Sequence, residues 1–123
     1  MSSSSFPNLR ASNVVADTSV LINLDASGHA GAIIQATSGV LLTTKNALEE
    51  LLEGERRGYS TASELRALQS DGVVKVVELG DAEEDIYRTL IEGPAAHTLG
   101  DGEAATIAYA VQNEAVALID ERK

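Results

Sequence analysis

Four acidic residues, spread over the length of the chain, stand where carboxylates could share a metal ion. They are Asp17 after the apolar run 14–16, Glu50 in the helical stretch 46–52, Glu103 after Gly-Asp-Gly, and Asp120 after the apolar run 116–119. These positions are strand ends and helix starts rather than solvated helix faces, which suggests a shared site. Carboxylates gathered together repel one another, and a bound divalent cation is the usual remedy. The pattern predicts metal-dependent chemistry.

The donor types narrow the choice of metal. The chain has no Cys, which excludes thiolate sites and disulfides, and its two histidines, His29 and His97, fall outside the acidic positions. We expect both histidines at the surface or in loops. A set of carboxylates alone fits Mg²⁺ and fits Zn²⁺ poorly. Such an ion suits phosphodiester hydrolysis, which needs an activated water and neutralised phosphoryl charge.

Each acidic residue also has a plainer interpretation. Asp17 could cap a helix, and Glu103 could merely favour a helix N-terminus through the helix dipole. Asp120 and the adjacent Glu121 could be surface charge. Within one helical stretch, three acidic residues compete for a single role: Glu49, Glu50 and Glu53. A common site is favoured because the acidic residues occur together, each at an expected element boundary.

The formal net charge of −10 argues against a broad electrostatic grip on nucleic-acid phosphates and favours a basic partner. This net charge does not exclude a nuclease, because part of the excess negative charge can come from active-site carboxylates that a bound metal ion neutralises. Lys45 follows an apolar run near the expected crevice and is a candidate for a phosphate contact. Arg56 and Arg57 could contact phosphates too, or could be a solvated basic pair.

Alternating strands and helices must position the acidic residues. Short apolar runs predict strands at 13–16, 40–42, 73–77 and 115–119. Helical spacing and capping residues predict helices at 18–24, 29–37, 46–54, 61–70 and 81–91, and a last one from Glu103 to about 111. This alternation predicts an α/β fold with a parallel sheet covered on both faces. Ligands bind at the carboxyl ends of such strands, where Asp17 and Asp120 stand.

A length of 123 residues fits one domain, with an aliphatic core because aromatic residues are scarce. Residues 1–12, which include a serine run, predict a flexible tail. They lack the basic and apolar regions of a secretory signal. No apolar run approaches the roughly 18 residues that a transmembrane helix needs. We therefore expect a cytoplasmic protein with no membrane partner.

Four segments resemble the motifs of the PIN-domain family, in the family's order. Residues 15–24, Val-Ala-Asp-Thr-Ser-Val-Leu-Ile-Asn-Leu, resemble the opening motif. Residues 99–110 resemble the third motif in its Gly-Glu variant, while 48–51 and 118–123 resemble the second and fourth. The resemblance implies a three-layer α/β/α sandwich with a short parallel sheet. It also implies a metal-dependent ribonuclease acting on RNA, often the toxin of a toxin–antitoxin pair with an antitoxin protein as partner.

The resemblance further implies residue roles. By motif match, the catalytic residues and ligands of one or two Mg²⁺ or Mn²⁺ ions would be Asp17, Glu50, Glu103 and Asp120. Glu121 competes with Asp120 as a metal ligand, and Asp101 would supplement Glu103. Thr18 or Ser19 would steady Asp17 or a metal-bound water.

The sequence departs from the family pattern at its end. Family members usually continue past the fourth motif with another helix and a final strand, whereas this sequence ends at Lys123. We therefore expect a PIN-like domain over 13–123 without those elements, and both a fragment and a genuinely short member stay open. The edge beside the fourth strand would be uncovered, and a homodimer would protect it. A catalytically inactive PIN-like module for protein binding or oligomerisation is the alternative function.

Overall fold

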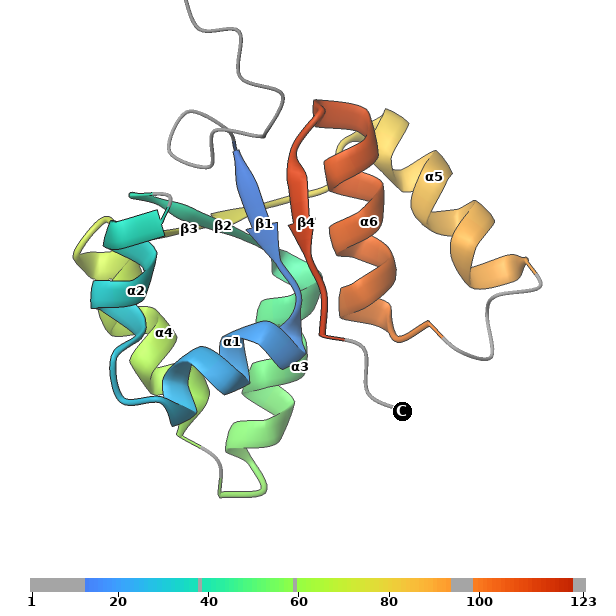
Figure 1. The fold of residues 1–123 in the computed structure, drawn as a ribbon. Helices are drawn as coiled ribbons and strands as arrows, with labels where there is room; N and C mark the ends of the chain where they lie inside the picture. The colour runs from blue at the N-terminus through green and yellow to red at the C-terminus, as the bar shows by residue number, and fades with distance from the viewer. Residues whose placement is uncertain (1–12, 38, 59, 94–98, 121–123) are drawn as a thin grey trace, which may run out of the picture.

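The sheet consists of four parallel strands in the order β3-β2-β1-β4 (Figure 1). The computed structural model describes residues 13–37, 39–58, 60–93 and 99–120. The strands are β1 (Val14–Ala16), β2 (Leu41–Thr44), β3 (Val74–Val77) and β4 (Val116–Leu118). The helices are α1 (Thr18–Ala26), α2 (Ala30–Thr37), α3 (Lys45–Glu55), α4 (Thr61–Ser70), α5 (Asp81–Glu92) and α6 (Asp101–Asn113).

The register of the sheet brings the ends of the strands to one edge. Ala16 of β1 lies opposite Thr43 of β2 on one side and Leu118 of β4 on the other. The ladder continues one step further, because the Asp17 N–H donates to the Leu118 carbonyl oxygen at 3.1 Å. Because all strands are parallel, the residues that follow them emerge together at the carboxyl edge, where α1 and α6 also begin (Figure 1).

Alternate residues of β1 face two separate cores. Val14 and Ala16 belong to a cluster with residues of α1 to α4, whereas Val15 packs with Ala110 of α6. Figure 1 shows the same division, with α1 to α4 on one side of the sheet and α5 and α6 on the other. All three β1 residues are buried, as a central parallel strand requires. This confirms the predicted three-layer α/β/α sandwich.

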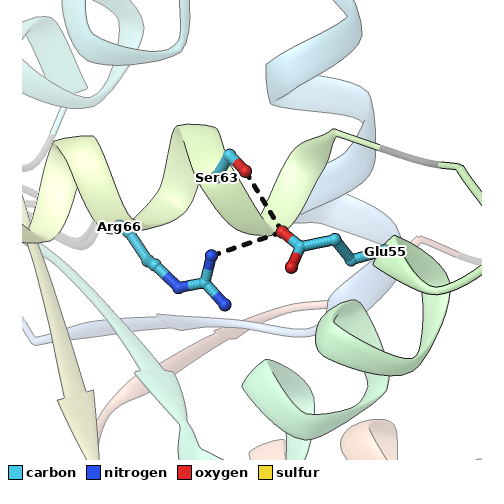
Figure 2. Close-up of polar contacts among 3 residues, drawn as sticks. All are labelled: Glu55, Ser63 and Arg66. Atoms are coloured by element: carbon cyan, nitrogen blue, oxygen red, sulfur yellow. Dashed lines mark hydrogen bonds and ion pairs between the residues drawn. The ribbon is translucent and has the colours of Figure 1, made fainter.

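A polar contact ties the far end of α3 to α4. One carboxylate oxygen of Glu55 accepts from the Ser63 hydroxyl at 3.1 Å and from Arg66 at 3.3 Å (Figure 2). The ion pair is exposed to solvent, so its contribution is at most about 1 kcal/mol. The contact fixes the α3–α4 corner at the end of α3 opposite to the sheet.

The main local difference from the sequence prediction concerns two threonines. Thr43 and Thr44 fall between the predicted strand at 40–42 and the predicted helix at 46–54, but both are buried residues of β2. The Thr43 hydroxyl donates to the Ala16 carbonyl oxygen at 3.3 Å, which satisfies it inside the sheet. Thr44 ends the strand and also caps α3, because its hydroxyl oxygen accepts from Ala47 N–H at 3.1 Å.

The other predicted helices and strands occur within about two residues of their expected bounds. The predicted tail at 1–12, His97 and Glu121 lie outside the described residues. Within the described ranges, no helix combines the length and apolar character needed to cross a membrane.

Helix α6 ends at a residue in a strained conformation. Glu114 has φ 51° and ψ 39°, in the left-handed region, and its N–H donates to the Ala110 carbonyl oxygen. A Cβ is unfavourable there, so we expect Glu114→Gly to raise the free energy of unfolding by about 1 kcal/mol. Urea denaturation measures this change. Glu114→Ala is the control, since it also removes the charge but keeps the Cβ, and an equal gain in both variants would contradict the conformational explanation.

Candidate functional site

One pocket at the carboxyl edge of the sheet gathers all four predicted acidic residues. It has a volume of about 300 Å³ and is lined by Asp17, Thr18, Ser19, Glu50, Gly100, Glu103 and Asp120. The residues come from the end of β1, the start of α1, the middle of α3, the start of α6 and the segment after β4. The fold therefore brings together carboxylates that are up to 103 positions apart in the sequence (from 17 to 120).

Asp17 is the most buried of these carboxylates, with 4% of its surface exposed. Its Oδ1 accepts from the Val20 N–H at 3.0 Å and caps α1. Burial raises the pKa of Asp17, and the nearby charges of Glu103, Asp120 and Glu50 raise it further, against the lowering effect of the Val20 N–H. Asp17 thus caps α1 and also lines the acidic pocket. The raised pKa means that a negative charge on Asp17 is disfavoured unless a cation offsets it.

Glu50 is held in place by two donors from different helices. The Thr18 hydroxyl donates to Glu50 Oε1 at 2.6 Å, and the Gly102 N–H donates to the same oxygen at 3.2 Å. Thr18 therefore steadies Glu50, whereas the family resemblance implied that Thr18 or Ser19 would steady Asp17 or a metal-bound water. This arrangement depends on the absence of a side chain at Gly102, because a Cβ there would overlap Glu50 and lie 2.6 Å from the Thr18 hydroxyl, so that these side chains would have to move.

The structure separates Glu50 from the two acidic residues that compete with it in the sequence. Glu49 is exposed, and Glu53 forms an exposed ion pair with Arg56 at 3.2 Å. Neither lines the acidic pocket. The choice of Glu50 within this helix therefore agrees with the geometry.

The other two acidic residues of the pocket are Asp120, which follows β4, and Glu103, which lies in α6. Asn23 of α1 donates to Asp120 Oδ2 at 2.7 Å, which holds the segment after β4 against α1. Sequence reasoning did not assign Asn23 a role, although it lies inside the segment that resembles the opening motif. Glu103 lies in the first turn of α6, where the helix dipole favours a carboxylate.

Asp101 does not line the pocket, in contrast to its predicted role beside Glu103. Its Oδ1 accepts from the Tyr87 hydroxyl of α5 and from Asn46 of α3, the latter at 3.4 Å. The hydrogen bond to Asp101 raises the pKa of Tyr87 to about 12, so the phenol stays protonated and keeps donating. Asp101 thus ties the start of α6 to two other helices.

The chemistry of the donors in the pocket suits a hard divalent cation. All four acidic side chains offer only oxygen. Burial first, and then the charges of the other three carboxylates, raise the pKa of Asp17, and a bound cation would offset both effects. In the described part of the chain, no group of three or more His, Cys, Asp or Glu side chains is arranged to hold a metal ion. The pocket thus fits Mg²⁺ or Mn²⁺ in donor type and charge but not in the arrangement of its side chains.

A larger cavity of about 490 Å³ lies away from the acidic pocket, between α1, α2 and α4. Most of its lining is apolar, with residues such as Leu21, Leu65 and Leu68. Its acidic residues do not converge as those of the smaller pocket do, and Asp25 already accepts from the Thr61 hydroxyl at 3.0 Å. His29 is exposed at its rim in the loop between α1 and α2, as predicted. The four acidic residues that the sequence singles out therefore line the smaller pocket and not this cavity.

Comparisons with known proteins agree with this fold. The family model DUF3368, described as a PIN domain, matches residues 13–123. The solved structure of VapC20 from Mycobacterium tuberculosis, a toxin that cleaves the sarcin-ricin loop, is similar with a TM-score of 0.60 and 22% sequence identity. The similarity covers 84% of this chain and 85% of that chain, and it supports the fold. No curated protein matches the chain significantly.

Proposed function

The chain belongs to the PIN-domain family DUF3368, and from this we propose that it is a metal-dependent endoribonuclease that hydrolyses RNA phosphodiester bonds. One observation carries the proposal, namely that acidic residues from four parts of the chain line a single pocket at the carboxyl edge of the sheet. In this proposal Asp17, Glu50, Glu103 and Asp120 hold Mg²⁺ or Mn²⁺. Glu121, next to Asp120, is a further proposed ligand.

Hydrogen bonds from neighbouring residues orient three of the four carboxylates in the pocket. Thr18 and Gly102 fix one oxygen of Glu50, the start of α1 fixes Asp17, and Asn23 fixes Asp120. Such supporting contacts preserve the orientation of ligands and limit their freedom. A bound ion would polarise the phosphoryl group and lower the pKa of an attacking water. Without a cation the same carboxylates repel RNA phosphates, so these residues make activity depend on the metal.

We propose further that the enzyme is the toxin of a toxin–antitoxin pair, acts in the cytoplasm and has an antitoxin protein as partner. The toxin VapC20, which shares the fold, supports this choice. A homodimer is also part of the proposal. In the described part of the chain, β4 is an edge strand of the sheet, and a second copy would cover that edge.

The proposal is tested by incubating the protein with a labelled single-stranded RNA. We expect cleavage in Mn²⁺ or Mg²⁺ and none in excess EDTA, with restored cleavage when metal is added back. Calorimetric titration with Mn²⁺ should show binding to the same protein preparation. Cleavage that continues unchanged in EDTA would contradict the proposed dependence on metal.

The second candidate is a catalytically inactive PIN-like module that binds another protein. The cavity between α1, α2 and α4 favours it, because it is larger than the acidic pocket and its leucine-rich lining could receive an apolar side chain of a partner. The same titration distinguishes the two candidates. A protein that neither binds Mn²⁺ nor cuts RNA would support the binding module.

A further inference from the structure

An ion pair stands at the carboxyl edge of the sheet, the edge that also carries the acidic pocket. Thr44 of β2 lies opposite Val77 of β3, and the next residues along the two strands are Lys45 and Glu78. Their side chains meet there, with Lys45 Nζ 3.2 Å from Glu78 Oε1. The parallel register therefore places a positive charge directly at the edge that carries the pocket.

The register between β1 and β2 places Lys45 one residue beyond the level of Asp17, which lines the pocket. Thr43 lies opposite Ala16, so Thr44 and Asp17 follow at the same level on neighbouring strands. Lys45 is the first residue of α3, which also carries Glu50 in the pocket. Since Lys45 and Asp17 follow adjacent strands, an RNA strand that crosses this edge from the pocket toward β3 passes Lys45.

The ion pair is open to solvent and easily exchanged. The side chains of Lys45 and Glu78 are 55% and 74% exposed. Exposed pairs of this kind contribute little to stability, so a phosphate group can replace Glu78 as the partner of Lys45. In a chain of net charge −10, an exposed lysine at the edge that carries the acidic pocket can attract phosphate.

We propose that Lys45 contacts an RNA phosphate next to the cleaved bond, and that Glu78 competes with the RNA for Lys45. This inference rests on the proposed ribonuclease function and adds a binding residue and its competitor to it. The inference predicts that replacing Lys45 lowers the affinity for RNA and that replacing Glu78 raises it. A purely structural ion pair would not show opposite effects.

The test compares Lys45→Met and Glu78→Gln, each of which breaks the ion pair. We expect KM for a labelled single-stranded RNA to rise about three- to fivefold in Lys45→Met and to fall about two- to threefold in Glu78→Gln, with kcat nearly unchanged. The salt dependence of log KM should weaken by about 0.7 in Lys45→Met, as expected for loss of one phosphate contact on a single strand. Fluorescence anisotropy with the same RNA in the cleavage-deficient Asp17→Asn background should rank affinities in the same order.

The matched control is the ion pair of Arg56 and Glu53, which is also exposed and also 3.2 Å long but lies at the other end of α3. Arg56→Met and Glu53→Gln change the net charge by the same amounts. We expect both to leave KM within about 1.5-fold of the parent value, since surface charges far from the bound phosphate are screened. An equal effect at this second pair would show a general charge effect and overturn the assignment of Lys45.

The outcomes separate this inference from the proposed function. If the parent cleaves RNA but Lys45→Met and Glu78→Gln change KM in the same direction, or not at all, the inference is wrong and the ribonuclease proposal stands. If the parent neither binds nor cleaves RNA in Mn²⁺, both are wrong. Equal losses of thermal stability without a change in KM would identify the pair as structural only.

Discussion

Replacing Asp17 by Asn should reduce RNA cleavage by at least about 100-fold while leaving the fold intact. Loss of a residue that merely supports a metal ligand typically costs 10- to 100-fold, and a proposed ligand should cost no less. The substitution removes the negative charge but keeps an oxygen that can accept from the Val20 N–H, so the cap of α1 is preserved. Initial cleavage rates in saturating Mn²⁺ measure the effect.

The stability of the same variant should change in opposite directions with and without metal. The pKa of Asp17 is raised above 3.8 in the folded protein, so the folded state holds its proton at pH values where the unfolded chain has lost it. The metal-free parent therefore loses stability as pH rises from about 3.8 through the raised pKa, and this loss persists at neutral pH. Asp17→Asn removes that loss, and in EDTA at pH 7 it should unfold at a higher temperature than the parent.

With Mn²⁺ the parent should unfold at a higher temperature than Asp17→Asn, the reverse of the order expected in EDTA. An ion present at 100 times its Kd stabilises the folded state by about 2.7 kcal/mol, which the parent gains and Asp17→Asn largely forgoes. Glu49→Gln is the control, because it makes the same change of charge at an exposed neighbour of Glu50. It should cleave RNA and respond to Mn²⁺ like the parent. Equal stabilisation of the parent and Asp17→Asn by Mn²⁺ would refute the role of Asp17.

Gly102→Ala should be strongly damaging, although alanine is the better helix former. In a helix interior the change from Gly to Ala normally stabilises by up to about 1 kcal/mol. Here the added Cβ would overlap Glu50, lie 2.6 Å from the Thr18 hydroxyl and lie 3.3 Å from the Ala47 backbone. We expect the free energy of unfolding to fall by about 1–3 kcal/mol and cleavage to fall with it, because Glu50 must leave its position.

Gly100→Ala is the matched control, two residues earlier in the same segment. A Cβ at Gly100 would lie no closer than 3.9 Å to Glu50, in ordinary contact, and the backbone there is extended. It should cost at most about 1 kcal/mol, through the weaker capping of α6 by Ala, and should keep most of the activity. Similar losses in both variants, measured by thermal unfolding and cleavage rate, would show that crowding against Glu50 is not the cause.

Much of the fold follows from local sequence signals. The strands are short apolar runs bounded by polar residues, so their positions are set by hydrophobicity that a single sequence displays. The carboxyl-edge positions of Asp17 and Asp120 follow directly, because each comes just after such a run. The choice of Glu50 over its neighbours depended on the family resemblance, since local composition does not distinguish acidic residues on one helix.

The contacts that hold the site could not be read from the sequence. Thr18 and Glu50 are separated by 32 positions, and Asn23 and Asp120 by 97. Which helices meet, and therefore which hydroxyl reaches which carboxylate, depends on strand order and helix packing, and neither leaves a local signal. The same reason explains why Asp101, adjacent to Gly102 in sequence, proved to bond Tyr87 instead of facing the pocket.

The position of β1 in the sheet makes the formation of the pocket depend on the synthesis of β4. β1 lies between β2 and β4, and β4 together with Asp120 is the last described part of the chain. During translation the N-terminal elements leave the ribosome first, so β1 must wait for residues near 120 before its second neighbour arrives. On the proposed function, a nascent chain cannot assemble its full set of carboxylates until Asp120 has been synthesised. The topology thereby keeps the proposed nuclease inactive until residues 116–120 have left the ribosome and β4 has joined β1.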